Sequence, residues 1–217
     1  MRTVSQISRG CLVVLEGGDY AGKTTQATLL VKRLQEAGHP AKFLRFPDRT
    51  TPIGHILDGY LKQSCNLHDY AVHLLFSANR WEAEPQMVTD LMNGTILVVD
   101  RYAFSGVAYT CAKPGMVIER CKQTDVGLPR PDVALYLKLS EEAFQTRRSE
   151  RCNEERYEQI EIQRKVMKNL EALSDPTYWK TVSADKSVEG LNDEIYSIVT
   201  DTLKKCRNTD IPRLWVD

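Results

Sequence analysis

The sequence has no hydrophobic run that approaches the roughly 20 residues needed to cross a bilayer as a helix. It also has no excess of either charge, since 29 lysines and arginines balance 29 aspartates and glutamates over 217 residues. A protein that binds nucleic acid or a membrane surface broadly carries a clear basic excess. We therefore expect neither a nucleic acid nor a membrane among its partners.

Metal-binding and targeting motifs are also scarce. The six cysteines form no C-x-x-C pair, and the four histidines stand at no zinc-binding spacing from them. The first ten residues hold two arginines and two serines but no apolar core, which argues against a secretory signal. Reduced thiols in the cytoplasm are the expectation, with the nucleus and, through a short presequence, the mitochondrion as alternatives.

The sequence does contain apolar runs that alternate with stretches of helical spacing. Strands are predicted at residues 11–16, 41–46, 96–99, 133–139 and 180–183. Helices are predicted at residues 24–38, 53–61, 69–92, 104–112, 116–122, 141–148, 155–173 and 188–206. This alternation predicts an α/β fold with a five-stranded parallel sheet flanked by helices. No repeat or shift in composition marks a second domain, so residues 1–217 are expected to form a single one.

The segment from Gly17 to Thr24 (GGDYAGKT) matches the pattern G-x-x-x-x-G-K-[ST] at every fixed position. It lies between a predicted buried strand and a predicted amphipathic helix, the context that this phosphate-binding loop requires. Glycines let the backbone N–H groups surround a phosphate, and the following helix offers its positive end. Lys23 is expected on the β- and γ-phosphates and the Thr24 hydroxyl on Mg²⁺. The segment therefore predicts a nucleoside triphosphate site.

A second chemical signal is Asp100-Arg101, directly after the predicted strand at 96–99. A carboxylate at a strand end beside the phosphate loop can meet the hydrated magnesium, and the arginine places a cation near the transferred phosphoryl group. A switch GTPase would need a guanine-binding pattern such as N-K-x-D, which the sequence lacks. The pair favours a small phosphotransferase over a GTPase.

Further segments carry a resemblance to a known family. They are residues 46–50 (FPDRT), 73–82 (HLLFSANRWE), 100–109 (DRYAFSGVAY), 125–129 (DVGLP) with 131–132 (PD), and 155–158 (ERYE). With the phosphate loop they span the chain from Gly10 to Trp215 and resemble thymidylate kinase, most of all its eukaryotic and poxviral branch. The resemblance implies a P-loop nucleoside monophosphate kinase fold with a short mobile lid at about 146–157. It also implies a homodimer that uses Mg²⁺ and ATP to convert dTMP to dTDP in dTTP synthesis.

Residue roles follow from the resemblance, position by position. dTMP binding falls to Asp19, Phe46, Arg49, Phe76, Arg80, Arg101, Ser105, Gly106, Tyr109, Tyr157 and Gln163. ATP binding falls to Gly17, Gly18, Tyr20, Ala21, Gly22, Lys23, Thr24, Thr25 and Arg148. Catalysis falls to Lys23, Arg49, Asp100, Arg101, Arg148 and Arg151, and metal binding to Thr24 and Asp100.

These roles agree with the chemistry of the side chains. Arg49 and Arg101 resemble a clamp on the acceptor phosphate, which a guanidinium can hold bidentately. Phe76 resembles the ring that stacks on thymine, and Arg80, four residues on, lies on the same helix face and resembles the donor to a base carbonyl. Asp19 resembles the acceptor for the deoxyribose 3′-OH, and Tyr109 the ring that leaves little space for a ribose 2′-hydroxyl.

One position departs from the eukaryotic pattern. Tyr20 stands where that branch usually has an arginine that reaches the γ-phosphate, and such an arginine is worth about 10³–10⁵ in rate. Some bacterial relatives use lid arginines instead. We hypothesise that Arg151 first, and Arg148 second, supply the missing charge.

Two other functions remain open at this point. One is a kinase for another nucleoside monophosphate, such as UMP, CMP or GMP, which the pocket of Phe76, Arg80 and Tyr109 would decide. The other is a P-loop binding protein whose catalysis has lapsed, an option that Tyr20 alone favours. Because uracil differs from thymine by one methyl group, dUMP is expected to be a weaker substrate.

Overall fold

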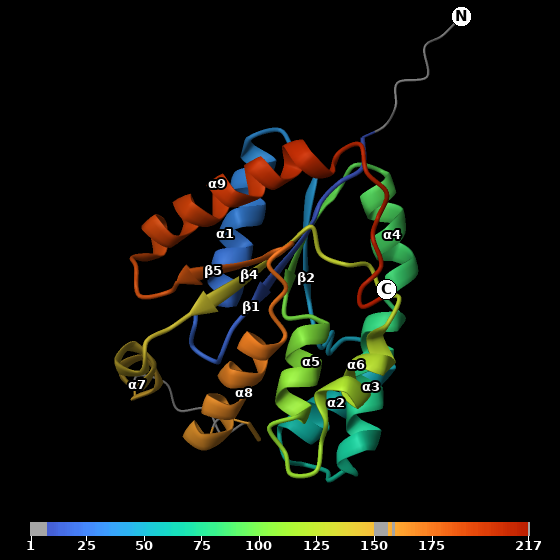
Figure 1. Cartoon of the computed structure of the whole chain (residues 1–217), viewed down its shortest axis with the longest axis vertical. Helices are drawn as coiled ribbons and strands as arrows, with labels where there is room; N and C mark the ends of the chain where they lie inside the picture. Colours follow the sequence, from blue (N-terminus) through green and yellow to red (C-terminus); the bar gives the residue numbers. More distant parts are fainter. Residues whose placement is uncertain (1–7, 150–155, 158, 217) are drawn as a thin grey trace, which may run out of the picture.

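The computed structural model describes residues 8–149, 156–157 and 159–216. Five parallel strands form one sheet in the order β2-β3-β1-β4-β5 (Figure 1). Their bounds are Leu12–Glu16 (β1), Ala41–Arg45 (β2), Ile96–Asp100 (β3), Val133–Lys138 (β4) and Trp179–Ser183 (β5). Every residue of β1 and β3 is buried, which explains why each strand is apolar up to the acid that ends it, Glu16 or Asp100. The predicted five-stranded parallel sheet is confirmed.

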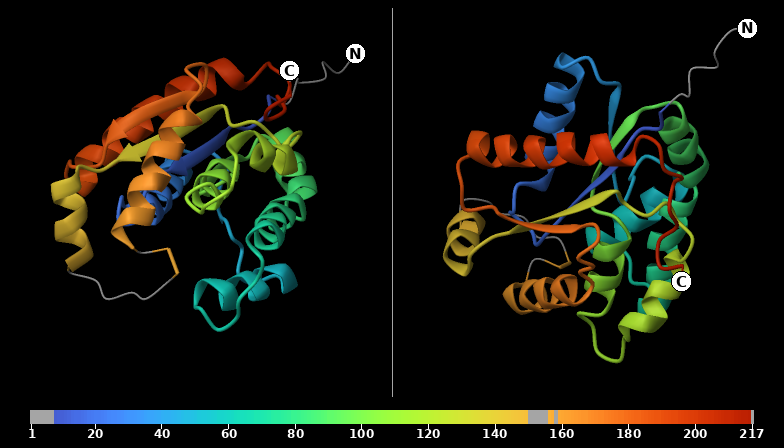
Figure 2. Two further views of the ribbon diagram at one scale, coloured as in Figure 1. Left: turned by 60° about the horizontal axis from the view of Figure 1, so that its bottom comes forward. Right: turned by 45° about the horizontal axis from the view of Figure 1, so that its top comes forward.

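Helices cover both faces of this sheet (Figure 2). Leu12 and Val14 of β1 pack in one core cluster, and Val13 and Leu15 pack in another, because successive strand residues point to opposite faces. The first cluster is completed by α4, α5 and α8, and the second by α1, α7 and α9. The helix bounds are Lys23–Glu36 (α1), Pro52–Leu61 (α2), Asp69–Trp81 (α3), Glu84–Met92 (α4), Ala103–Thr110 (α5), Ile118–Lys122 (α6), Glu141–Ser149 (α7), Ile160–Ala172 (α8) and Val188–Cys206 (α9). Gln123–Asp125 forms a short 3₁₀ helix, η1.

The prediction of one helix over residues 69–92 is wrong. The chain forms two helices there, since α3 ends at Trp81 and α4 begins at Glu84 with Pro85 in its first turn. Proline lacks a backbone N–H and its ring clashes with the preceding turn of a continuous helix, but it is well tolerated at a helix start. The apolar spacing continues across the break, so spacing alone does not reveal it.

The predicted lid at about 146–157 lies partly outside the described residues, which omit 150–155 and 158. Its first part belongs to α7, and α8 begins at Ile160 rather than near residue 155. Over the described ranges, no helix combines the length and apolar character needed to span a membrane.

The strand order brings the two chemical segments together. β1 pairs with β3 in parallel register, with Leu15 opposite Asp100, so the loop after β1 and the pair Asp100-Arg101 leave the same edge of the sheet. Ligand sites of open α/β sheets lie at the carboxyl ends of the strands.

Candidate active site

The loop after β1 wraps around the start of α1 in the manner that phosphate binding requires. Gly17 and Gly22 have φ values of 148° and 85°, which side chains rarely adopt, and Gly22 forms the N-cap of α1. A Cβ atom on Gly17 would lie 2.7 Å from the Leu137 carbonyl oxygen. A pocket beside the loop is lined by all six residues from Tyr20 to Thr25. The first helical turn therefore faces this pocket, as expected for a triphosphate site.

The Lys23 side chain folds back onto the phosphate loop. Its ammonium donates to the Gly18 carbonyl at 2.6 Å, and the residue is only 6% exposed. Burial, with a smaller contribution from the nearby positive charge of Arg101, lowers the pKa of Lys23 to about 8. A partly desolvated cation of this kind interacts strongly with an arriving phosphate.

Thr24 and Asp100 meet at the edge of the same pocket. The Thr24 hydroxyl donates to Oδ2 of Asp100, and the Asp100 side chain is almost fully buried. Its other oxygen, Oδ1, is buried without a hydrogen-bond partner among the described residues. A hydroxyl and a carboxylate oxygen are ligands that Mg²⁺ prefers, and a buried carboxylate oxygen without a partner suits a cation. The residues present therefore fit a magnesium ion.

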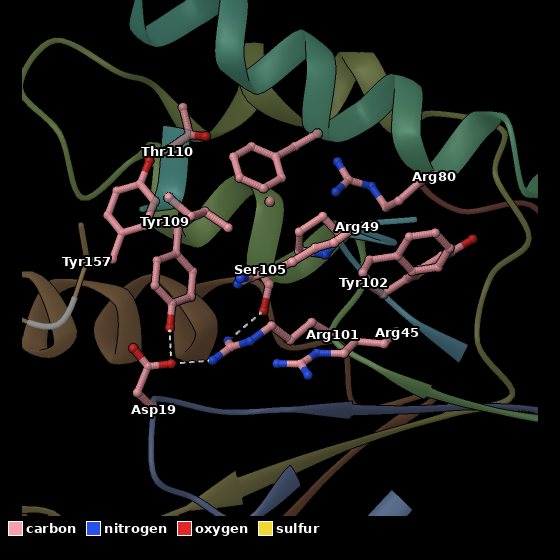
Figure 3. Close-up of a pocket in the computed structure, with 15 residues that line it drawn as sticks. Asp19, Arg45, Arg49, Arg80, Arg101, Tyr102, Ser105, Tyr109, Thr110 and Tyr157 are labelled. Carbon is pink, nitrogen blue, oxygen red and sulfur yellow. Dashed lines mark hydrogen bonds and ion pairs between the residues drawn. The ribbon is translucent and has the colours of Figure 1, made fainter. Parts of the chain in front are cut away.

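Arg101 lines both this pocket and a second one, in which it lies beside Asp19 and Ser105 (Figure 3). Its guanidinium forms an ion pair with Asp19 and donates to the Gly17 carbonyl at 3.2 Å and to the Ser105 hydroxyl at 3.3 Å. Burial alone would lower the pKa of Arg101, but Tyr109 and Asp19 beside it raise the pKa above the ordinary value. Arg101 is thus a permanent charge shared by the two pockets.

Arg49 also lines both pockets, and so does Arg45 at the end of β2. The Arg49 guanidinium donates to Asp58 of α2 at 2.8 Å. Three arginines therefore stand between the phosphate loop and the second pocket. This is the place where the charge of a transferred phosphoryl group has to be neutralised.

The second pocket has aromatic walls and one deeply buried cation. Phe46, Phe76 and Tyr157 contribute rings, and Arg80 of α3 contributes its guanidinium. Arg80 is 2% exposed and forms a bidentate pair with Asp125, at 3.0 Å and 2.6 Å. A pocket with aromatic walls and one fixed hydrogen-bond donor is suited to a planar base.

Gly106 of α5 lets Arg80 approach. A Cβ atom at this position would lie 2.7 Å from Nη2 of Arg80 and 2.9 Å from Nη1. Contacts this short do not occur with a real side chain, so only glycine admits the guanidinium here.

A polar network joins the phosphate loop to α8. Oδ1 of Asp19 accepts from the Tyr109 hydroxyl at 3.1 Å, and Oδ2 accepts from the Gln163 amide at 2.5 Å. Gln163 in turn accepts from the Asp19 backbone N–H at 2.9 Å and donates to the Tyr157 carbonyl at 2.9 Å. Burial raises the pKa of Tyr109, which stays protonated and can donate. Gln163 is buried behind Asp19 and fixes the carboxylate rather than lining the pocket.

Comparison with known proteins identifies the family. The model of the thymidylate kinase family matches residues 15–195. Thymidylate kinase from Danio rerio is 46% identical over 95% of this chain and 98% of its own length, and that from Homo sapiens is 44% identical over the same shares. The chain belongs to the thymidylate kinase family.

A solved structure extends the match to three dimensions. The thymidylate kinase of Candida albicans superposes with a TM-score of 0.85 at 34% identity, covering 95% of this chain and 99% of that one. Membership makes this protein a nucleoside monophosphate kinase, that is, a phosphotransferase with the P-loop fold. The resemblance that the motifs predicted is confirmed.

The arginines near the predicted lid are placed differently from one another. Arg147 lines the phosphate pocket, donating to the carbonyls of Tyr20 at 3.2 Å and Ala184 at 2.8 Å. Arg148 is half-buried and lies outside the described lining of both pockets. Arg151 lies outside the described residues. Tyr20 lines the same pocket as Arg147.

Sequence reasoning assigned no role to several residues of this thymidylate kinase site, among them Glu16, Arg45, Asp125 and Arg147. Glu16 is fully buried at the end of β1, where it accepts from the Ser105 hydroxyl at 2.5 Å and the Tyr102 backbone N–H at 2.9 Å. Burial raises the pKa of Glu16, although the hydrogen bond from Ser105 opposes the shift. The carboxylate fixes the start of α5, which carries Ser105, Gly106 and Tyr109. An acid at the end of an otherwise apolar run was the signal that could have revealed it.

Proposed function

We propose that this protein transfers the γ-phosphoryl group of ATP to dTMP, giving dTDP and ADP, as a step in dTTP synthesis. The observation that carries the proposal is the position of Arg49 and Arg101 in the lining of both pockets. ATP then occupies the loop side and dTMP the aromatic side, with the two phosphate ends facing each other. The acceptor is already an anion, so transfer needs positioning and charge neutralisation rather than a strong general base.

The roles of the loop residues follow from this placement. Lys23 binds the β- and γ-phosphates, while the backbone from Gly17 to Thr25 surrounds them. Thr24 and Asp100 would hold Mg²⁺, which neutralises phosphate charge when it is bound. Arg49 and Arg101 hold the dTMP phosphate in line with the γ-phosphate.

The aromatic pocket then selects the nucleoside. Phe76 stacks on the base, and Arg80, which Asp125 holds in place, donates to a base carbonyl. Tyr109 limits the space beside C2′, and Asp19 accepts from the 3′-OH. The network from Gln163 to Asp19 keeps that carboxylate fixed before the nucleotide arrives.

The direct test is a coupled assay of ADP release with ATP and a panel of nucleoside monophosphates. The proposal requires ADP release that depends on dTMP and exceeds that with UMP, CMP or GMP. Release that follows another monophosphate would establish a different kinase. No release with any of them would establish a binding protein without catalysis.

dUMP is expected to be a genuine but weaker substrate. A single methyl group changes binding in an apolar pocket by a modest amount, so kcat/KM should be roughly 10–200-fold lower than for dTMP. The related thymidylate kinase of Candida albicans has broad substrate specificity, which is consistent with a permissive pocket. The same assay at millimolar dUMP measures the ratio, and undetectable turnover there would contradict the expectation.

We retain Arg151 as the first candidate and Arg148 as the second for the γ-phosphate charge that Tyr20 cannot supply. Arg151→Ala should lower kcat by about 100-fold and change the KM for dTMP much less. Steady-state kinetics of the two single alanine variants, with Tyr20→Arg as the complementary gain of charge, separate the candidates. Native turnover in Arg151→Ala would remove it from the mechanism.

We further propose a cytoplasmic homodimer, with helices that include the Phe76 segment at the interface. On α3, the apolar side chain of Leu74 is 46% exposed and is therefore available to an interface. Light scattering should give a mass near twice the 24.7 kDa of one chain, and Leu74→Arg should shift it toward that of the monomer. A native chain that elutes as a monomer at micromolar concentration would argue against the dimer.

Immunofluorescence would distinguish the proposed location in the cytoplasm from the nucleus and the mitochondrion.

A further inference from the structure

One face of α7 rests on the phosphate loop through Tyr20. Phe144 and Arg147 are three residues apart and therefore share a face of the helix. Phe144 is 3% exposed, and its ring meets the Tyr20 ring edge to face, with centroids 5.8 Å apart and an interplanar angle of 62°. Arg147 donates to the carbonyl of the same tyrosine at 3.2 Å. Tyr20 therefore contacts both residues of this face.

The two ends of α7 are held by different contacts. At the first turn, the Ser140 hydroxyl accepts from the Ala143 backbone N–H at 3.2 Å, and Glu141 pairs with Arg164 at 2.7 Å. The side chains of this ion pair are 43% and 57% exposed, so it contributes little. Arg147, in the later part of the helix, donates to the backbone carbonyls of Tyr20 and Ala184, while the Tyr20 ring packs one turn earlier, on Phe144. Tyr20 thus supports the part of α7 whose cation lines the ATP pocket.

The conformation of Tyr20 suits this task. Its φ of 64° lies in the left-handed region, as part of the tight turn of the phosphate loop. Its ring packs against the core cluster that includes Phe144. An uncharged ring cannot neutralise phosphate charge. It can, however, give an arginine on a neighbouring helix a fixed support.

We propose that Tyr20 is a positioning residue, whose ring holds Phe144 so that Arg147 keeps its guanidinium in the ATP pocket. The inference rests on the proposed ATP site, and it gives the tyrosine at position 20 a role in that site. Arg147 is then a cation of the ATP pocket in addition to the two candidates for the γ-phosphate charge, Arg151 and Arg148, and Tyr20 determines where its guanidinium lies.

The test is calorimetric titration of Mg·ADP into the native chain, Tyr20→Ala, Tyr20→Phe, Arg147→Ala and the double variant Tyr20→Ala/Arg147→Ala. Tyr20→Ala should weaken ADP binding about fivefold, since it removes one aromatic pair. Tyr20→Phe keeps the ring and should retain the native affinity. Tyr20→Ala should cause no further loss once Arg147 is alanine, because the proposal has the ring act on ADP binding only through the position of Arg147. In the kinetic assay, the KM for ATP should rise while that for dTMP stays close to native.

Three results would overturn the inference: native ADP affinity in Tyr20→Ala, an equal loss in both Arg147 backgrounds, or a loss in Tyr20→Phe that matches Tyr20→Ala. Thermal unfolding followed by circular dichroism monitors the fold of each variant. Phe144→Leu keeps apolar volume but removes the partner ring, and it should reproduce the loss of ADP affinity if Tyr20→Ala does not fold. The titration contains no nucleoside monophosphate. If the protein phosphorylates a monophosphate other than dTMP, the assay of ADP release with dTMP would fail, but the effects of the Tyr20 and Arg147 variants on ADP binding would remain.

Discussion

Arg101→Ala is expected to lower kcat by about 10³-fold, the effect of removing a cation that stabilises a transferring phosphoryl group. Arg101 stands where the two pockets meet and pairs with Asp19 of the phosphate loop. Its loss removes a fixed charge from the transition state and also leaves the Asp19 carboxylate as a source of repulsion for phosphate. Single-turnover kinetics with ATP and dTMP measure the chemical step directly.

The controls separate this role from a general loss of charge or fold. Lys138→Ala removes one positive charge from an exposed pair with Glu171, away from both pockets, and should leave kcat unchanged. Arg101→Lys keeps the charge but not the fork, so its rate should lie between alanine and native. A native kcat in Arg101→Ala, with the fold intact by circular dichroism, would remove the residue from the reaction.

Asp125→Ala is expected to destabilise the protein by about 3–5 kcal/mol. The reason is the burial of its partner, because Arg80 is 2% exposed and would keep an unpaired charge in the core. A loss of this size lowers the melting temperature by roughly 10 °C in a protein of this length. Urea unfolding of both proteins gives the free-energy difference.

A matched double variant separates the effect of this ion pair on stability from its effect on dTMP binding. Arg80→Met/Asp125→Leu removes both charges and fills the space, so most of the stability should return. The KM for dTMP should nevertheless stay raised, because the donor to the base is gone. Recovery of dTMP affinity together with stability would show that Arg80 does not contact the nucleotide.

The central strands were predictable because a strand buried on both faces is apolar along most of its length. β1 and β3 are fully buried, and each is apolar except for the acid that ends it, Glu16 or Asp100. The break between α3 and α4 was not predictable from spacing, because the apolar pattern continues on both sides of Pro85. The end of α3 and the start of α4 depend on the backbone N–H that Pro85 lacks rather than on the distribution of apolar residues.

The candidate site also contains residues that the sequence could predict and residues that it could not. Lys23 and Thr24 were predictable because the backbone geometry of the loop requires its glycines at fixed spacing. Asp125 was not, since its importance arises from a contact with a residue 45 positions away. Arg45 becomes visible only when β2 and β3 are paired and its place opposite Asp100 is known.

Gly106 restricts how this enzyme can be made more thermostable. Replacing a helical glycine by alanine commonly raises stability by about 0.4–1 kcal/mol, so α5 would invite that substitution in a screen. Here an added methyl group would push against the guanidinium of Arg80. The gain in chain entropy would come with a displaced base-binding arginine, so directed evolution for heat resistance should keep this position unchanged as long as turnover is also selected.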